Sequence, residues 1–260
     1  MTALMLFVLT CQTAAVPADE AVAQFEEMVF TVPAADPPRE VRYRLLKPAK
    51  VEPGKKYPVV LFLHGAGERG DDNRKQLAYF PEWMTRAEWR EKYPCYLIAP
   101  QCPSGKWWGG ARRPTDEAAK ANQPPAEADV ALAVLRALST ALPIDQQRIY
   151  LTGLSMGGYG SWSLAAQHPE LFAAVVPICG GGIPTTAERL KDVPIWAIHG
   201  GADTVVPPQQ SRDMIEAIKA AGGAPKYTEL EGVGHDSWTA AYNDPQGPLP
   251  WMFEQRKKQD

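Results

Sequence analysis

The strongest constraint on the fold comes from residues 149–158, IYLTGLSMGG, where an apolar run ends at a serine flanked by glycines. Gly153, Ser155 and Gly157 fill the pattern G-x-S-x-G, in which the serine lies on a sharp turn between a strand and a helix. Glycine suits the flanking positions because such a turn brings neighbouring backbones too close for a Cβ. The pattern therefore predicts a strand, a tight turn and a helix, with the hydroxyl of Ser155 presented as a nucleophile.

The helix predicted after Ser155 directs its first backbone N–H groups and the positive end of its dipole at the serine. An oxyanion that forms during acyl transfer would be stabilised at that point. A five-residue pattern of common residues also arises by chance. Here, however, a strand precedes the pattern, a helix follows it, and acidic and histidine candidates come later in the order that such a site requires. The context therefore favours the nucleophile.

The composition suits one large domain, because 260 residues with 45% hydrophobic content can bury a sizeable core. Lys plus Arg number 27 against 30 for Asp plus Glu, and the formal charge of −3 does not indicate a nucleic-acid or membrane-surface partner. No Cys and His pair has the spacing of a zinc site, and we predict neither a metal nor an organic cofactor. Cys95 and Cys102 bracket a strand-like segment that would hold them too far apart for a disulfide, which predicts free thiols.

Residues 1–9 are apolar and precede a region of small residues with candidate cleavage sites after Ala15 and Ala18. This arrangement is typical of a secretory signal peptide. We therefore predict a signal peptide over residues 1–18, a single catalytic domain over residues 19–260, and a secreted or periplasmic protein. The segment lacks a Lys or Arg near its start, and an N-terminal tail on a cytoplasmic protein is the alternative. No other segment has the roughly 18 apolar residues that a membrane span needs.

The rest of the chain alternates strand-like and helix-like runs. The strand-like runs, of which the first two look like an antiparallel pair, are residues 25–32, 41–46, 58–63, 96–99, 148–152, 173–178, 195–199 and 227–230. The spacing of apolar residues predicts helices over residues 72–86, 126–142, 156–168 and 209–221. Buried strands separated by helices indicate an α/β fold, with a mostly parallel sheet of eight strands and helices on both faces. Ligands bind such sheets beyond the carboxyl ends of the strands.

Eight strands in this order, with the serine turn after the fifth, resemble the α/β-hydrolase fold over about residues 25–245. HGAGERG (residues 64–70), APQ (residues 99–101), the pair Trp107-Trp108 and the serine motif resemble secreted bacterial carboxylesterases. These are close to predicted peptidases and to the polyhydroxybutyrate depolymerase and feruloyl esterase groups. The resemblance implies a serine esterase with a Ser, Asp, His catalytic triad. A serine peptidase of the prolyl-oligopeptidase type is the alternative activity, and a non-catalytic binding module on the same fold is a third.

In this fold the acidic residue of the triad follows the seventh strand, and Asp203 in residues 196–207, WAIHGGADTVVP, occupies that position. The alternative role for Asp203 is a helix N-cap. His235 is the only histidine after Asp203, so the order Ser155, Asp203, His235 is satisfied once. Asp236, next to the histidine, is the rival acid.

Residues 65–70 match the pattern G-x-G-x-x-G after a strand, which also occurs in dinucleotide-binding proteins. That fingerprint needs an acidic residue about 20 positions on to hold a ribose, but the next strand ends in Ala-Pro-Gln. The α/β-hydrolase resemblance gives the loop another use, because the fold draws one N–H of its oxyanion hole from this loop. By resemblance, the two donors are the backbone N–H groups of Ala66 and Met156, and His64 braces the loop by hydrogen bonding.

Trp107, Trp108 and Trp238 lie on loops on the side of the predicted site, where their rings would stack on aromatic or sugar-bearing esters. The alternative is that they pack the loops, because tryptophan is usually well buried. Little chain separates Asp203 from His235, which leaves little room for a large lid and predicts an open cleft. We therefore expect a serine carboxylesterase for short-chain or aromatic esters, feruloyl and acetyl-sugar esters among them. The substrate would be a small molecule or an ester linked to a polysaccharide.

Overall fold

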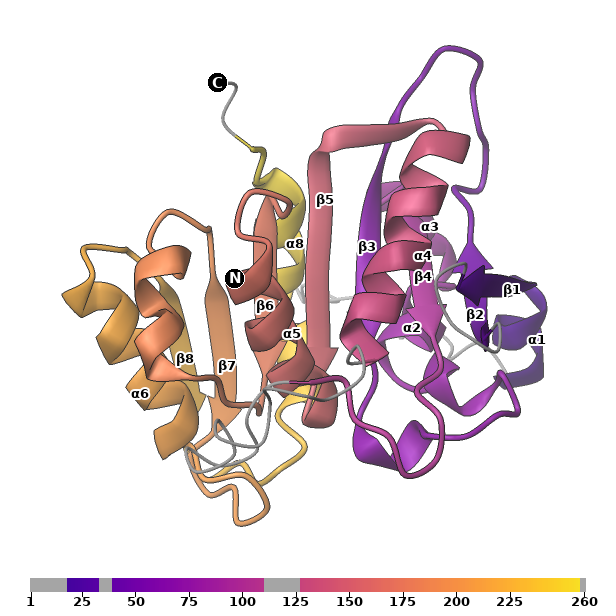
Figure 1. Ribbon diagram of the computed structural model, residues 1–260. Coiled ribbons are helices and arrows are strands. Elements are labelled where there is room, and N and C mark those ends of the chain that lie inside the picture. Colours follow the sequence, from indigo (N-terminus) through magenta and orange to yellow (C-terminus); the bar gives the residue numbers. More distant parts are fainter. Residues whose placement is uncertain (1–17, 33–38, 110–126, 258–260) are drawn as a thin grey trace, which may run out of the picture.

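The computed structural model describes residues 18–32, 39–109 and 127–257. These residues form one sheet in the strand order β1-β2-β4-β3-β5-β6-β7-β8 (Figure 1). The strands are β1 (Glu26–Val32), β2 (Arg39–Leu46), β3 (Tyr57–Leu63), β4 (Tyr96–Pro100), β5 (Ile144–Leu154), β6 (Ala174–Ile178), β7 (Trp196–Gly200) and β8 (Lys226–Leu230). Each of them coincides with a run predicted from the sequence, although β5 begins at Ile144 rather than at residue 148.

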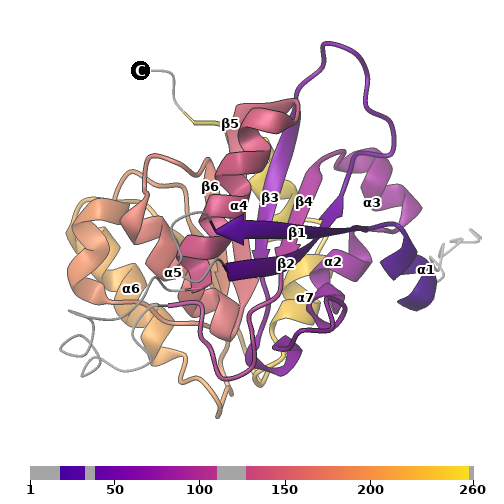
Figure 2. The same ribbon diagram turned by 45° about the vertical axis from the view of Figure 1, so that its right-hand side comes forward.

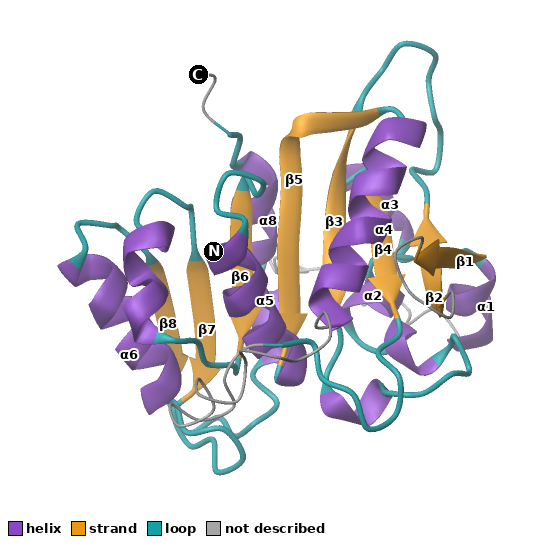
Figure 3. Cartoon of the chain, viewed as in Figure 1, coloured by secondary structure: helices purple, strands orange, loops and turns teal. Residues whose placement is uncertain are grey.

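The pairing of the strands places the carboxyl ends of all the parallel strands at one edge of the sheet. β1 pairs with β2 in antiparallel register, with Glu26 opposite Leu45, as predicted. β2 is also antiparallel to β4, and from β4 across to β8 the neighbouring strands are parallel. The carboxyl ends of the parallel strands therefore share one edge, and Figure 3 shows the loops that follow them gathered there. An α/β sheet binds its ligands at this edge.

All seven residues of β3 are buried. Successive side chains of a strand point to opposite faces of the sheet, so those of β3 alternate between two cores. Val59 and Leu61 belong to a core that α4, α5 and α6 complete. Val60 and Phe62 belong to a second core, against which α1, α2, α3, α7 and α8 pack. Figures 1 and 2 show helices on opposite faces of the sheet, as predicted. The helices are α1 (Ala18–Ala23), α2 (Phe80–Trp83), α3 (Ala87–Lys92), α4 (Glu127–Ala141), α5 (Met156–Gln167), α6 (Gln209–Ala220), α7 (Trp238–Asn243) and α8 (Pro248–Glu254).

The prediction of one continuous helix over residues 72–86 is wrong. This segment contains a 3₁₀ turn, η2 (Lys75–Leu77), and then the four-residue helix α2. Tyr79 between them has a φ of 64°, and a positive φ interrupts a right-handed helix. Pro81 stands in the first turn of α2, which is where a helix tolerates a residue without an N–H.

The structure describes little of the N-terminal segment that was predicted to be a signal peptide. The signal peptide predicted over residues 1–18 lies outside the described residues except for Ala18, which begins α1. In the described part of the chain, no helix is both long enough and apolar enough to cross a membrane.

Cys95, Cys102 and Cys179 are buried free thiols, in agreement with the prediction for the first two.

Candidate active site

Ser155 lies on the turn between β5 and α5, at the carboxyl edge of the sheet. Its φ of 52° and ψ of −114° fall outside the regions that L-residues favour, and such a conformation costs on the order of 1–3 kcal/mol. The end of β6 holds this conformation. The Ser155 N–H donates a hydrogen bond to the carbonyl oxygen of Ile178 at 2.9 Å and lies 3.3 Å from Cys179 Sγ. The serine thus occupies the strained turn that G-x-S-x-G predicts.

Crowding explains the glycines around Ser155. A Cβ on Gly153 would lie 2.6 Å from the carbonyl oxygen of Leu63, and a Cβ on Gly158 would lie 2.4 Å from that of Ile178. Both distances are far below a van der Waals contact. Neither glycine has a positive φ, so the close approach of other backbone segments excludes larger residues at these positions.

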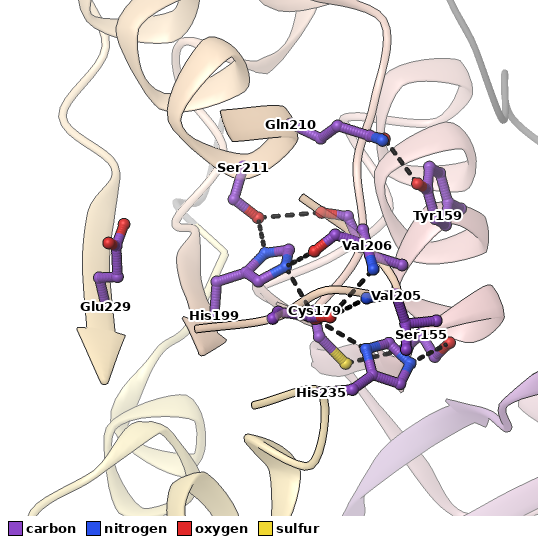
Figure 4. A network of polar contacts seen from close by, with 12 residues as sticks. Ser155, Tyr159, Cys179, His199, Val205, Val206, Gln210, Ser211, Glu229 and His235 are labelled. Carbon is purple, nitrogen blue, oxygen red and sulfur yellow. Dashed lines mark hydrogen bonds and ion pairs between the residues drawn. The ribbon is translucent and has the colours of Figure 1, made fainter. Parts of the chain in front are cut away.

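Hydrogen bonds join Ser155 to His235, as Figure 4 shows, and His235 to Asp203. His235 Nδ1 lies 2.7 Å from Asp203 Oδ2, and His235 Nε2 lies 2.9 Å from Ser155 Oγ. Because an ionised carboxylate can only accept, Nδ1 carries the proton of the ring and Nε2 is left to accept the serine hydroxyl. The structure therefore brings together the three residues that the sequence order selected, from the loops after β5, β7 and β8.

The environment of Asp203 keeps its carboxylate ionised and fixed. Burial raises the pKa of this carboxyl, since its side chain is fully buried, but hydrogen bonds outweigh burial and the pKa lies below its ordinary value. His235 supplies one of these bonds. The backbone N–H groups of Val205 and Val206 supply two more to Oδ1, at 2.8 and 2.9 Å. Asp203 caps this turn and does not cap α6, whose N-cap is Pro208.

Asp236, the rival acid, has hydrogen-bond partners other than His235. Asp236 accepts hydrogen bonds from the N–H and the hydroxyl of Thr239, both at 3.1 Å, at the start of α7.

His64 is buried, its Nδ1 lies 2.6 Å from the carbonyl oxygen of Gly65, and its Nε2 accepts the N–H of Cys102 at 2.9 Å. Burial lowers the pKa of His64 to about 4, so the ring is neutral near pH 7. It braces the loop after β3 by hydrogen bonding, as predicted.

The two predicted oxyanion donors both begin helical turns at the carboxyl edge. Met156 is the first residue of α5, and Ala66 is the first residue of η1 (Ala66–Glu68), which follows β3. N–H groups at the start of a helix have no acceptor inside that helix. Side chains hold the β3 loop in place, because Arg69 Nε donates to the Ala66 carbonyl at 2.9 Å and Gln101 Nε2 donates to that of Glu68 at 3.1 Å.

The three tryptophans differ from the prediction in exposure. Trp108 is 1% exposed, and its Nε1 donates to the carbonyl oxygen of His64 at 2.8 Å. It is a core residue, because Gly160 of α5 leaves room for it, and the prediction that it stacks on substrate is wrong. Trp107 is half-buried, with its ring centroid 6.1 Å from that of Tyr159. Trp238 belongs to α7 rather than to a loop, is 9% exposed and meets the ring of His235 edge-on at 5.5 Å.

Sequence reasoning missed Cys179, whose thiol lies 3.3 Å from the backbone N of Ser155. This residue is fully buried and has a φ of 41°. Its position directly after β6 was the available signal, because β6 is the parallel neighbour of β5 and the ends of adjacent strands meet. Among the described residues, no group of three His, Cys, Asp or Glu side chains is arranged to hold a metal ion.

A sheet of this strand order, with a serine on the turn after β5 and its histidine and aspartate partners after β8 and β7, defines an α/β-hydrolase. The chain belongs to the phospholipase/carboxylesterase family, which residues 49–244 match.

Three proteins illustrate what this chain is similar to. The chain is similar to a thermostable esterase of known structure, with 38% identity and a TM-score of 0.81 over 91% of this chain and 64% of the esterase. It is 29% identical to a poly(3-hydroxyoctanoate) depolymerase from Pseudomonas fluorescens, over 60% of this chain and 58% of the depolymerase. A ferulic acid esterase shares the fold, with a TM-score of 0.65 and 19% identity over 88% of this chain and 98% of that enzyme. The chain spans less than two thirds of the length of the first two relatives.

Proposed function

We propose that this protein is a serine carboxylesterase that hydrolyses short-chain or aromatic esters through an acyl-enzyme. The observation that carries the proposal is the unbroken series of hydrogen bonds from Asp203 through His235 to Ser155, on a strained turn at the ligand-binding edge of the sheet. Membership of the phospholipase/carboxylesterase family and the similarity to a thermostable esterase support the same reaction class.

The geometry supports a two-step mechanism. His235 Nε2 takes the hydroxyl proton of Ser155 as Oγ attacks the acyl carbonyl, and Asp203 holds the ring in the required tautomer and stabilises its charged form. The backbone N–H groups of Ala66 and Met156 stabilise the oxyanion. His235 then gives the proton to the leaving alcohol, and water repeats the attack on the acyl group to release the acid. No step requires a cofactor.

The proposed substrate class follows from the surroundings of Ser155. The chain between Asp203 and His235 is taken up by α6, β8 and their loops, which leaves no lid-sized insertion there. Of the three tryptophans, Trp107 is half-buried rather than buried and lies near Tyr159 of α5, so we assign the contact with an aromatic acyl group to it. Two similar proteins are named as a ferulic acid esterase and a poly(3-hydroxyoctanoate) depolymerase, and we propose small-molecule or polysaccharide-linked esters as the substrates of this chain.

We also propose export directed by residues 1–18, which N-terminal sequencing of the mature protein tests.

A chain-length series of p-nitrophenyl esters, with methyl ferulate and a peptidyl-anilide alongside, tests the proposal. We expect kcat/KM to be highest for acetate to butyrate or for the hydroxycinnamate. It should fall beyond about eight carbons, because added methylenes left in water gain none of the roughly 0.8 kcal/mol that burial of each would provide. A preference for long acyl chains would require an acyl tunnel, and activity confined to the anilide would replace the esterase with a peptidase.

A further inference from the structure

A second imidazole contacts the acid of the candidate triad. His199, in β7, is completely buried, and its Nε2 lies 3.3 Å from Asp203 Oδ2 and 3.0 Å from the carbonyl oxygen of Val206. Figure 4 shows its ring between Ser211 and Val206, on the side of the network away from Ser155. The mechanism above assigns no role to this histidine.

The contacts of His199 determine which nitrogen carries its proton. Burial lowers the pKa of the ring, so the ring is neutral and holds one proton. Nε2 faces two acceptors, Asp203 Oδ2 and the carbonyl of Val206, and therefore carries that proton. Nδ1 then accepts the hydroxyl of Ser211, whose Oγ lies 2.8 Å away and is also 2.9 Å from the carbonyl oxygen of Gly180. Ser211 thus fixes the tautomer of His199, as Asp203 fixes that of His235.

With this tautomer, four N–H groups surround the Asp203 carboxylate. Val205 and Val206 donate to Oδ1, while His235 and His199 lie against Oδ2. A carboxylate has about four lone-pair sites, and the Nε2–H of His199, which lies 3.3 Å from Oδ2 and also faces the carbonyl oxygen of Val206, is placed against the fourth. Without it, one lone pair of a buried anion would have no donor, and the carboxylate could turn away from His235.

We propose that His199 is a positioning residue that orients Asp203 through the Nε2–H and so keeps His235 aligned with Ser155. This role rests on the proposed esterase function and deepens it. Glu229 in β8 is the other carboxylate near this ring, but it binds Arg212 at 2.5 and 2.8 Å and the hydroxyl of Tyr227 at 2.7 Å. Asp203 is therefore the carboxylate that depends on His199.

A matched pair of amide variants tests the role. In His199→Gln the amide nitrogen stands as many bonds from Cβ as Nε2 does, so it reaches Asp203. In His199→Asn the amide nitrogen stands where Nδ1 did, so it cannot. We expect kcat on p-nitrophenyl butyrate to fall about ten- to a hundredfold in His199→Asn, the range of a hydrogen bond to a charged group, with KM unchanged. His199→Gln should recover most of that loss.

Equal kcat values in the two folded variants would overturn the proposal, as would a loss that appears in KM alone. Thermal melts of both variants separate lost positioning from lost folding. If neither variant folds, ¹⁵N spectra of the wild-type histidines decide the question. The proposal requires His199 to be protonated at Nε2 near pH 7, and protonation at Nδ1 alone would overturn it. An inactive wild type with the expected His199 tautomer would instead refute the esterase function.

Discussion

The carbonyl oxygen of Leu63 lies 1.8 Å from the point that a Cβ on Gly157 would occupy. The first turn of α5 therefore rests directly on the backbone at the end of β3. Gly157 has no positive φ, so the second glycine of G-x-S-x-G is required by this contact and not by its own conformation. The contact brings the turn that carries Ser155 against β3, the strand that leads into the loop containing Ala66.

Gly157→Ala should be severely destabilising, because backbone at the end of β3 or in α5 would have to move. Overpacking typically costs about 1–3 kcal/mol, and we expect the top of that range or more here. Gly67→Ala is the matched control, since nothing lies within 4 Å of its Cβ position. Urea denaturation measures both, and a Gly157→Ala variant as stable as the control would contradict the packing described.

Asp203→Asn should lower kcat by on the order of 10⁴, because the amide no longer holds His235 in the required tautomer. Asp236→Asn should have little effect on kcat, since Asp236 only caps the start of α7 through Thr239. Steady-state kinetics on p-nitrophenyl butyrate compares them. The opposite ranking would make Asp236 the acid.

Trp108→Ala should lower the free energy of unfolding by about 3–5 kcal/mol, the usual cost of removing a buried large aromatic side chain. Trp107→Ala should cost less stability. It should also reduce kcat/KM for methyl ferulate beyond any loss on p-nitrophenyl acetate, by about 0.5–1.5 kcal/mol of stacking. A selective loss on aromatic esters in a stable Trp108→Ala variant would restore Trp108 as a substrate contact.

His64 should make the protein less stable at mildly acidic pH. Its folded pKa of about 4 lies below the unfolded value of 6.5, so the unfolded state binds more protons between these values. The stability contribution is complete above pH 6.5 and is lost as the pH falls toward 4, by roughly 3 kcal/mol in total. His64→Asn removes this titration. Denaturation of both proteins from pH 4 to 7 should show a steeper dependence in the wild type, and parallel curves would exclude the effect.

The sequence predicted the framework well because short apolar runs bounded by turns are strong signals of buried parallel strands. Tyr57–Leu63 is apolar at every position because helices cover both faces of the sheet there. Ser155, Asp203 and His235 could be selected in the same way, because each follows one of the strand-like runs that became β5, β7 and β8.

What the sequence did not predict depends on contacts between distant segments. Tyr79 looks helix-compatible in sequence, but its φ of 64° in the folded chain, together with the φ of 50° at Asn73, breaks the helix expected over residues 72–86. Trp108 is buried because Gly160, 52 positions later, leaves space beside it, and no local pattern reports that. His199 ends the strand-like run over residues 195–199, and its contact with Asp203 follows from the turn that brings the carboxylate back toward β7.

In the proposed mechanism Ser155 carries the acyl group, and trapping the acyl-enzyme would identify the nucleophile. The protein would be mixed with p-nitrophenyl acetate, quenched in acid during the burst, digested and analysed by mass spectrometry. We expect one acetylated peptide, which contains Ser155. We also expect a Ser155→Ala variant that folds normally, is not acetylated and keeps no more than about a thousandth of the wild-type rate. Acetylation of another residue in the burst, or a Ser155→Ala variant with substantial turnover, would contradict it.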